Sequence, residues 1–189
     1  MEFGIDEVGR GCWAGPLVLA AVSLSRDIDG LNDSKKLTAL KRQKLCEKIH
    51  QNYNIVIIQS ISSTEVDSMG LGEAMRIGCE RLFQSISKEN YDRVVVDGNL
   101  NYLSQYVGTE SLIGGDAINR NCMAASIVAK EHRDDYMRRL AIKYPDYGFE
   151  RHVGYGTKQH KEALDRSGIT SEHRVSFKPI KQYVAEERT

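Results

Sequence analysis

Ile5-Asp6-Glu7-Val8-Gly9-Arg10-Gly11 lies near the start of the chain, and the apolar run Leu17-Val18-Leu19-Ala20-Ala21-Val22-Ser23-Leu24 follows it after Gly15-Pro16. The length and bounding residues of the run fit a buried strand, so the two stretches predict the start of a sheet. Asp6 and Glu7 would point to opposite faces of a strand and would repel if brought near one another. A divalent cation would remove that repulsion, which makes this strand a candidate metal site.

The loop that leaves the first strand has the composition of a phosphate contact. Gly9 and Gly11 can expose bare backbone N–H groups, and Arg10 between them offers a fork of donors. Acids for a metal beside a basic loop for a phosphate indicate metal-assisted phosphodiester chemistry. Asp-Glu alone is a common dipeptide that more often marks a solvated strand end, so the rest of the chain has to supply further ligands.

Length and charge bound the class of protein. The 189 residues predict one domain, residues 1–189, large enough for a real core. With 26 basic and 26 acidic residues the net charge is zero, which argues against binding to nucleic acid by charge alone but not against clustered basic residues.

Cysteine spacing and hydropathy indicate the compartment. The four cysteines are far apart with no CxxC pair, which is typical of unpaired thiols rather than a disulfide set or a zinc site. The start of the chain lacks a signal-peptide pattern, and no apolar run approaches the roughly 20 residues that span a bilayer. We therefore expect a soluble cytoplasmic monomer with no membrane association.

Capping signals predict the helices of the first half. Thr38 is a suitable N-cap for a helix that runs to about residue 51, and residues 54–61 have the pattern of a strand. Ser62 and Glu65 have the spacing of a capping box. A helix should follow to about residue 86, with a break at Gly70-Leu71-Gly72.

Two further acids fall at the ends of predicted elements. Asp97 ends the β-branched strand of residues 91–97, and ligands commonly bind at this carboxyl edge of an open α/β sheet. Asp116 begins a helix over residues 117–143, where the dipole favours a negative group, although capping alone also explains an acid there. Asp134-Asp135 and Arg138-Arg139 should form the solvated face of that helix.

Residues 148–160 are dense in glycine, tyrosine and histidine, which predicts a surface loop leading into a short helix over residues 159–167. Aromatic side chains among basic groups can stack on sugars or bases while the cations hold phosphates.

Together the acids predict a site for a hard cation. Asp6, Glu7, Asp97 and Asp116 lie at strand ends or a helix start and could converge on one sheet edge. Oxygen ligands without histidine or cysteine suit Mg²⁺ or Mn²⁺ rather than zinc. Two such ions, about 3.5–4 Å apart, could activate a water and stabilise the leaving oxygen of a phosphodiester.

A series of short motifs runs in order along residues 3–180. They are Ile5 to Gly11 with Ala14-Gly15-Pro16, Asn32-Asp33-Ser34-Lys35-Lys36-Leu37, Val96-Asp97-Gly98, Gly115-Asp116-Ala117, residues 124–130, Arg133-Asp134, Gly148-Phe149, His152, Gly154-Tyr155-Gly156-Thr157, His160, His173-Arg174 and Ser176-Phe177. In this register the chain resembles the ribonuclease HII family. The resemblance implies an α/β, ribonuclease H-like fold, in which a five-stranded mixed sheet is flanked by helices and a C-terminal helical and loop extension covers about residues 145–189.

The resemblance also implies a function. It implies an endonuclease that cuts the RNA strand of RNA–DNA hybrids and nicks duplex DNA 5′ of a single embedded ribonucleotide, leaving a 3′-hydroxyl and a 5′-phosphate. The implied metal-binding catalytic acids are Asp6, Glu7, Asp97 and Asp116. The implied substrate contacts are Gly9, Arg10 and Gly11 at the backbone and 2′-hydroxyl, Tyr155 on the sugar of the ribonucleotide, and Ser34, Lys35 and Lys36 on phosphates.

Three departures and two alternatives accompany the resemblance. Cys12-Trp13 stands where the family usually has small or ordinary apolar residues, and Val153 stands where it often has lysine. The stretch Asn119-Arg120-Asn121-Cys122-Met123 is also less typical after Gly-Asp-Ala. The paralogous ribonuclease HIII shares the acids but normally adds an N-terminal substrate-binding domain; the start at the first strand and the intact Gly-Arg-Gly favour HII. A noncatalytic hybrid-binding module is disfavoured, because four acids near phosphates would weaken pure binding.

Overall fold

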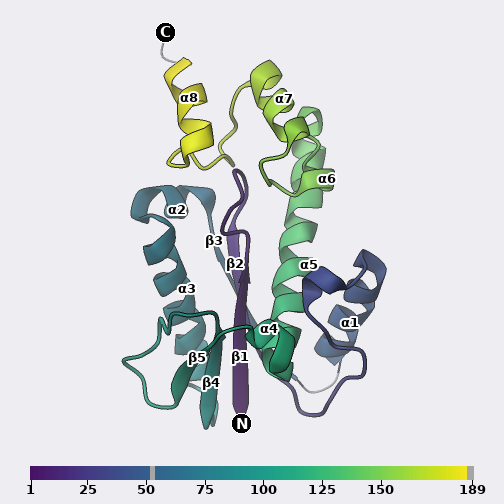
Figure 1. Ribbon diagram of the computed structural model, residues 1–189, viewed down its shortest axis with the longest axis vertical. Coiled ribbons are helices and arrows are strands. Elements are labelled where there is room, and N and C mark those ends of the chain that lie inside the picture. The colour runs from purple at the N-terminus through teal and green to yellow at the C-terminus, as the bar shows by residue number, and fades with distance from the viewer. Residues whose placement is uncertain (52–53, 187–189) are drawn as a thin grey trace. The chain divides into compact units, whose positions relative to one another are not determined.

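The computed structural model describes residues 1–51 and 54–186, and its centre is a five-stranded mixed sheet in the order β3-β2-β1-β4-β5 (Figure 1). The strands are β1 (Glu2–Val8), β2 (Leu17–Ser23), β3 (Ile55–Ile61), β4 (Arg93–Asp97) and β5 (Thr109–Leu112). β1 pairs antiparallel with β2 and parallel with β4, and β4 pairs parallel with β5. The predicted mixed sheet is confirmed.

Helices separate and follow the later strands in the chain. They are η1 (Ser34–Lys36), α1 (Ala39–Gln51), α2 (Ser63–Met69), α3 (Leu71–Ile86), α4 (Gly115–Ile118), α5 (Arg120–Lys143), η2 (Pro145–Tyr147), α6 (Phe149–His152), α7 (Lys158–Ser167) and α8 (Lys178–Glu186). Among the residues described, no helix has both the length and the apolar character needed to cross a membrane.

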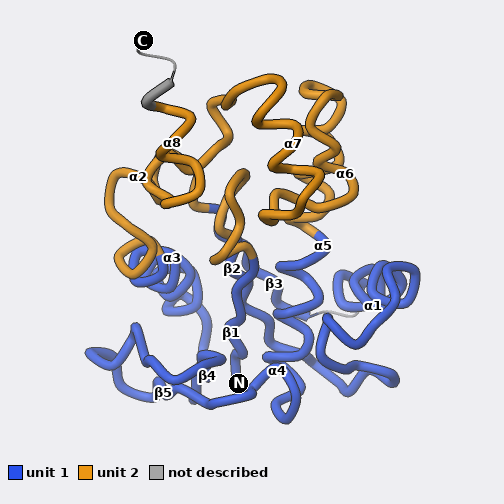
Figure 2. The backbone as a smooth tube through the Cα atoms, turned by 45° about the horizontal axis from the view of Figure 1, so that its top comes forward, with its two compact units in different colours: residues 1–8, 18–60, 75–131 blue, residues 9–17, 61–74, 132–189 orange. Residues whose placement is uncertain are grey.

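The chain divides into two compact units (Figure 2). Unit 1 comprises residues 1–8, 18–60 and 75–131, and unit 2 comprises residues 9–17, 61–74 and 132–189. Unit 1 therefore contains nearly all of the sheet, whereas unit 2 contains the loop between β1 and β2 and the helices that follow α5.

The core of unit 1 packs on both faces of β2, as its uninterrupted burial requires. Val18, Ala20 and Val22 belong to a buried cluster with residues of α1 and α5. Leu19, on the opposite face, lies against Gly78 of α3, where an added Cβ would come within 2.5 Å of the leucine. Helices thus cover both faces of the strand, as the continuous apolar run of residues 17–24 predicts.

The core of unit 2 is a separate hydrophobic cluster. Its buried members are Ala14, Met137, Leu140, Tyr147, Phe149, Ala163, Leu164, Ile180 and Tyr183. Trp13 is half-buried and packs against this cluster. The loop between β1 and β2 is therefore part of a core built largely from residues more than 120 positions later in the chain.

Most of the predicted capping signals are confirmed. Ser62 and Glu65 form a complete capping box at α2, and Thr38 accepts a bond from the N–H of Lys41 at the start of α1. Gly70, with φ of 80°, separates α2 from α3. The predicted helix over residues 117–143 is interrupted at Asn119, whose extended backbone divides α4 from α5.

Two predictions about solvent exposure are wrong. Residues 148–160 are not simply a surface loop: they include α6, and Phe149, His152 and His160 are buried. The histidines can be buried because their ring nitrogens have hydrogen-bond partners: backbone groups for His152, and the Tyr155 carbonyl and His173 for His160. Asp134 is also buried, whereas Asp135 and its ion-pair partners Arg138 and Arg139 lie on the exposed face of α5.

The expected C-terminal extension of about residues 145–189 consists of short helices from η2 to α8. Its last three residues, 187–189, lie outside the described part of the chain.

Candidate active site

Three carboxylates come together at one end of the sheet in unit 1. Asp6 of β1, Asp97 at the end of β4 and Asp116 of α4 each offer an oxygen, and these atoms lie within 4.8 Å of one another. The parallel pairing of β1 with β4 sets Ile5 opposite Val96 and so brings the two strand acids side by side. Gly115 completes the approach, because its absent Cβ would lie only 3.2 Å from Oδ1 of Asp97.

The electrostatics of this group favour a cation. Burial, followed by the charges of Glu7 and Asp97, raises the pKa of Asp6 well above its usual range. Burial and the charge of Asp116 raise the pKa of Asp97, although backbone hydrogen bonds act in the opposite direction. Within residues 1–51 and 54–186, Oδ1 of Asp97 is a buried oxygen with no hydrogen-bond partner. An orphaned oxygen beside two further carboxylates is what a hard metal ion would satisfy.

Lys35 supplies a positive charge to the group. Its Nζ lies 3.3 Å from Oδ2 of Asp116, and although burial opposes its charge, Asp116 outweighs that effect and raises the pKa of Lys35. The short helix η1 that carries Lys35 is anchored by its first residue: the buried hydroxyl of Ser34 lies 2.6 Å from that of Ser126. Arg42 also donates to the Ser34 carbonyl, at 3.3 Å, and so fixes η1 against α1.

Glu7 does not belong to the three-carboxylate group. In the β1–β2 register Asp6 lies opposite Ala20 and Glu7 opposite Leu19, so the two acids occupy opposite faces of the sheet. The face of Glu7 is the one covered by α3, where burial and the charge of Glu7 raise the pKa of Cys79 to about 12. The proposed role of Glu7 as a metal ligand stays a prediction.

In unit 2, two buried arginines shape the loop between β1 and β2. Both Arg133 and Arg174 are fully buried. Arg133 donates to the carbonyls of Ala14 and Pro16 at 3.0 and 2.9 Å, and Arg174 donates to those of Arg10 and Gly15 at 3.1 and 2.9 Å. Each guanidinium thus supplies N–H donors to loop carbonyls that have no regular backbone partner of the kind a helix or sheet provides. The sequence marks both arginines only as motif members and gives no sign that they are buried.

The loop has a rigid base and an exposed tip. Gly9 is buried with φ of 94°, and a Cβ there would lie 2.4 Å from Nε of Arg133, so the fold requires glycine. Arg10 and Gly11 are exposed at the turn. Gly11 does not have a left-handed backbone, and a Cβ on it would meet no described atom within 4 Å. Nothing in the described fold therefore requires a glycine at position 11.

Tyr155 lies in the same unit as this loop. Its side chain is 40% exposed, and the guanidinium of Arg133 lies 6.0 Å from the ring centroid. Burial, followed by the charge of Cys12 and a hydrogen bond with it, raises the pKa of Tyr155. The ring is thus fixed on one side and accessible on the other.

Trp13 joins the loop to the segment around Tyr155. Its backbone N–H donates to the Gly154 carbonyl at 2.8 Å, and the centroid of its ring lies 5.4 Å from that of the His160 ring. A Cβ on Gly156 would lie 2.1 Å from the indole. Cys12 and Trp13 therefore anchor the Gly154-Tyr155-Gly156 segment, which explains the first departure from the family pattern.

The second departure from the family pattern, Val153, has a strained backbone conformation. Val153 has φ of 42°, a left-handed conformation that β-branched residues rarely adopt. The carbonyl of Val153 accepts a hydrogen bond of 2.7 Å from Arg133, which holds the backbone in place. The residue ends α6 and turns the chain toward Tyr155.

Two buried histidines, His160 and His173, support the backbone of Tyr155. Nε2 of His160 lies 3.0 Å from Nε2 of His173, and Nδ1 of His160 lies 3.0 Å from the Tyr155 carbonyl. Because the backbone N–H of Thr170 donates to Nδ1 of His173, the ring proton of His173 resides on Nε2, which donates to Nε2 of His160. Burial lowers the pKa of His160 to about 4 and that of His173 to about 3, so both rings are neutral at pH 7. Sequence spacing gives no sign of this network.

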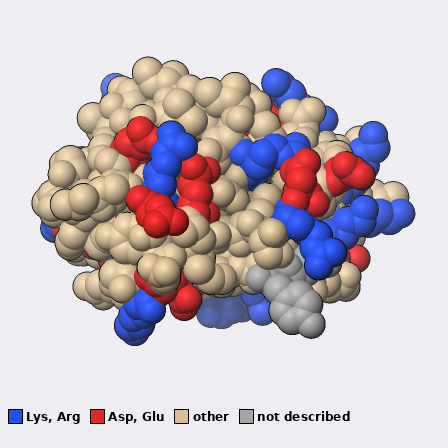
Figure 3. Space-filling view, turned by 90° about the horizontal axis from the view of Figure 1, so that it is seen from below, with Lys and Arg blue, Asp and Glu red and all other residues tan. Residues whose placement is uncertain are grey.

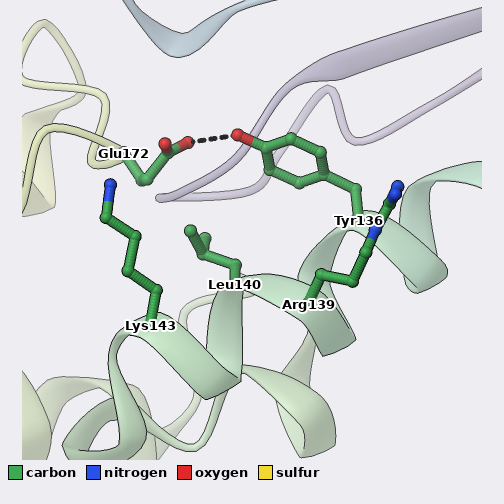
Figure 4. A pocket seen from close by; sticks show the side chains of 5 residues that line it. All are labelled: Tyr136, Arg139, Leu140, Lys143 and Glu172. Atoms are coloured by element: carbon green, nitrogen blue, oxygen red, sulfur yellow. Dashed lines mark hydrogen bonds between the residues drawn. The ribbon is translucent and has the colours of Figure 1, made fainter.

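Unit 2 also has a pocket of about 360 Å³ beside α5 (Figure 4). Tyr136, Arg139, Leu140, Lys143 and Glu172 line it. The hydroxyl of Tyr136 donates to Glu172 at 2.9 Å, and the backbone carbonyl of Glu172 accepts from Gly15 at 2.9 Å. The pocket therefore belongs to the scaffold of the β1–β2 loop and has no carboxylate group like that of unit 1.

Comparison with protein families gives one consistent result. The model of the family "Ribonuclease HII" matches residues 3–180. A ribonuclease HII of Staphylococcus carnosus is 43% identical over 97% of this chain and 70% of its own length. One from Thermosynechococcus vestitus is 41% identical over 92% of this chain and 82% of its own.

Solved structures agree with the sequence relatives. Ribonuclease HII from Archaeoglobus fulgidus, solved in complex with PCNA, matches with a TM-score of 0.81 at 26% identity, over 94% of this chain and 95% of its own. An Mn²⁺ complex of Bst-RNase HIII has a TM-score of 0.74 at 19% identity, over all of this chain and 70% of its own, and shares the fold.

Proposed function

Because the chain belongs to the ribonuclease HII family, we propose that it nicks duplex DNA on the 5′ side of an embedded ribonucleotide and cuts the RNA strand of RNA–DNA hybrids. It is a metal-dependent nuclease that hydrolyses phosphodiester bonds. The products would be a 3′-hydroxyl and a 5′-phosphate. The convergence of Asp6, Asp97 and Asp116, with an orphaned oxygen on Asp97, is the observation that carries the proposal.

The acids of unit 1 would bind the metal, and Lys35 would position one of them. Asp6, Asp97 and Asp116 would hold the metal, Mg²⁺ or Mn²⁺, with Glu7 as a further ligand. When bound, such an ion supplies Lewis acidity to a water and to the leaving oxygen. Lys35 orients the carboxylate of Asp116 and balances part of its charge.

The residues of unit 2 would discriminate RNA from DNA. The 2′-hydroxyl is the group that distinguishes the two at a single nucleotide. The bare backbone of Gly11 is open to close approach by a sugar, and Gly9 and Arg10 belong to the same turn, which Arg133 and Arg174 hold rigid. The exposed ring of Tyr155 would stack on the ribose.

The predicted phosphate contacts differ in their exposure to solvent. Arg10, Lys35 and Lys36 are exposed cations that would hold phosphates without reading base sequence. Ser34 remains a predicted contact, although its hydroxyl is turned to Ser126. We further propose that residues 1–189 act as one catalytic domain and as a monomer.

A duplex DNA with one ribonucleotide tests the proposal directly. In Mg²⁺ or Mn²⁺ the protein should nick it immediately 5′ of the ribonucleotide, leave an all-DNA duplex intact, and lose activity on chelation. Asp97→Asn should lower the rate at least about 100-fold, equivalent to ~2.7 kcal/mol of barrier. Asp29→Asn, which neutralises an exposed acid of the same unit, is the matched control and should keep full activity.

Two results would overturn the proposal. The first is a folded protein that binds the hybrid but cuts neither substrate with either metal, as a noncatalytic binding module would. The second is unchanged turnover in Asp97→Asn, which would remove Asp97 from the site.

A further inference from the structure

A different pocket, in unit 1, lies beside α1 and has an unusual lining. Its cavity volume is about 450 Å³, and its walls are Gly30, Asn32, Lys36, Leu37, Thr38, Lys41, Lys44, Leu45 and Lys48. Four of these nine residues are lysines and none is acidic. The pocket is therefore strongly positive in a chain whose net charge is zero.

Elsewhere in unit 1, several cations are paired with acids. Arg93, for example, bonds to both Glu2 and Glu110 across three neighbouring strands. On the face shown in Figure 3, several basic side chains lie directly beside acidic ones. A field of one sign, as in the pocket beside α1, attracts an anionic partner.

The arrangement of the lysines fits an extended polyanion. Lys41, Lys44 and Lys48 are spaced three and four residues apart, so they lie along one face of α1. At 1.5 Å per residue the first and last are about 10 Å apart along the helix. One strand of a duplex carries a phosphate about every 3.4 Å of helix axis, so this face spans about three phosphates.

The pocket is linked to the carboxylate group through η1. Lys35 of this three-residue helix bonds to Asp116, and the next residue, Lys36, lines the pocket. Ser126 and Arg42 both bond to Ser34, the first residue of η1, and so fix the backbone that carries the two lysines. A nucleic-acid strand bound at the acids would reach the pocket by crossing η1.

We propose that the pocket beside α1 binds the sugar–phosphate backbone of the substrate duplex, away from the bond that is cut. The inference rests on the proposed function for the nature of the partner. The contact is electrostatic and independent of base sequence. Leu37 and Leu45 provide an apolar floor for the lysine stems, which leaves the ammonium groups at the surface.

Salt dependence of binding tests the pocket without any cleavage. Affinity for a fluorescent RNA–DNA hybrid and for a DNA duplex would be measured by anisotropy in a chelator, from 50 to 200 mM salt. Each lost phosphate contact should reduce the slope of log K against log salt by about 0.9. Lys41→Gln/Lys44→Gln should therefore reduce the slope by about 1.8 on both duplexes, while Lys88→Gln, at an exposed lysine of unit 1 outside the pocket, should leave it unchanged.

Steady-state nicking gives the second readout. The double variant should raise KM several-fold and keep the kcat of the unmodified protein, because the pocket touches no reacting atom. An unchanged slope and KM in the double variant would overturn the assignment of the pocket. If the unmodified protein nicks normally in that case, the proposed function stands and only the pocket assignment fails. If the unmodified protein binds duplexes but cuts nothing, the proposed function fails, and the salt slopes still test whether the pocket binds the duplex backbone.

Discussion

At the scale of the residue, Gly9 and Gly11 differ in whether the fold requires glycine at their position. Gly9 has a left-handed backbone and lies against Arg133, so an added methyl group would collide with the fold. Gly11 has neither constraint among the described residues. A glycine that the fold does not need increases the entropy lost on folding, and close approach of a ligand to the backbone is a reason to keep it.

This difference predicts opposite behaviour for two alanine variants. Gly11→Ala should keep the thermal stability of the unmodified protein within about 0.5 kcal/mol, because it adds only an exposed methyl group. It should lower nicking at a single ribonucleotide by about tenfold or more, equivalent to ~1.4 kcal/mol. Gly9→Ala should instead lower the melting temperature. Full nicking by Gly11→Ala would show that the substrate does not approach this backbone.

At the scale of the element, the loop between β1 and β2 owes its shape to buried guanidinium forks rather than to a regular turn. Arg174 donates to two carbonyls of the loop through three N–H groups, and burial lowers its pKa to about 10. Lysine cannot reproduce a planar fork of donors, even though it keeps the charge.

Arg174→Lys should therefore destabilise the protein by about 2–4 kcal/mol, since it leaves buried carbonyls without donors. The loss should appear as a lower midpoint in urea at pH 7. The same variant should raise KM for a ribonucleotide-containing duplex, because Arg10 loses the bond to its carbonyl. Arg166→Lys, at an exposed arginine of unit 2, is the control. A midpoint equal to that of the control would contradict a stabilising role of Arg174.

At the scale of the whole molecule, the sequence predicted the sheet and most helix caps, and three of the four acids that it expected to converge lie together. It could do so because apolar runs, capping pairs and strand-end acids are local signals. It did not predict the burial of His160 or the interior role of Arg133. Those depend on which distant carbonyl or side chain each residue meets, and spacing in the sequence does not record that.

The buried histidines also give the whole molecule a predicted sensitivity to acid. His160 and His173 have folded pKa values of about 4 and about 3, below their ordinary 6.5. Between pH 6.5 and 4 the unfolded chain binds more protons than the folded one, so the free energy of unfolding falls as the pH falls. From pH 7 to 5 the loss should be on the order of 1–2 kcal/mol per histidine. The raised pKa values of Asp6 and Asp97 act in the opposite direction.

Urea unfolding at pH 7, 6 and 5 measures this dependence. His160→Gln should show a smaller loss of stability between pH 7 and 5 than the unmodified protein, because glutamine does not titrate. His50→Gln, which replaces an exposed histidine of α1, should retain the full loss. Parallel losses in all three proteins would mean that the buried histidines do not control the response.

The hydrogen bond from Arg174 to the carbonyl of Arg10 has a consequence for biosynthesis. It joins residues 164 positions apart, and a ribosome releases the N-terminal residue of that pair first. The loop that would probe the ribose cannot take its final form until more than nine-tenths of the chain has been translated. A chain that ends before Arg174 would therefore contain Asp6, Asp97 and Asp116 but not the donor that shapes this loop.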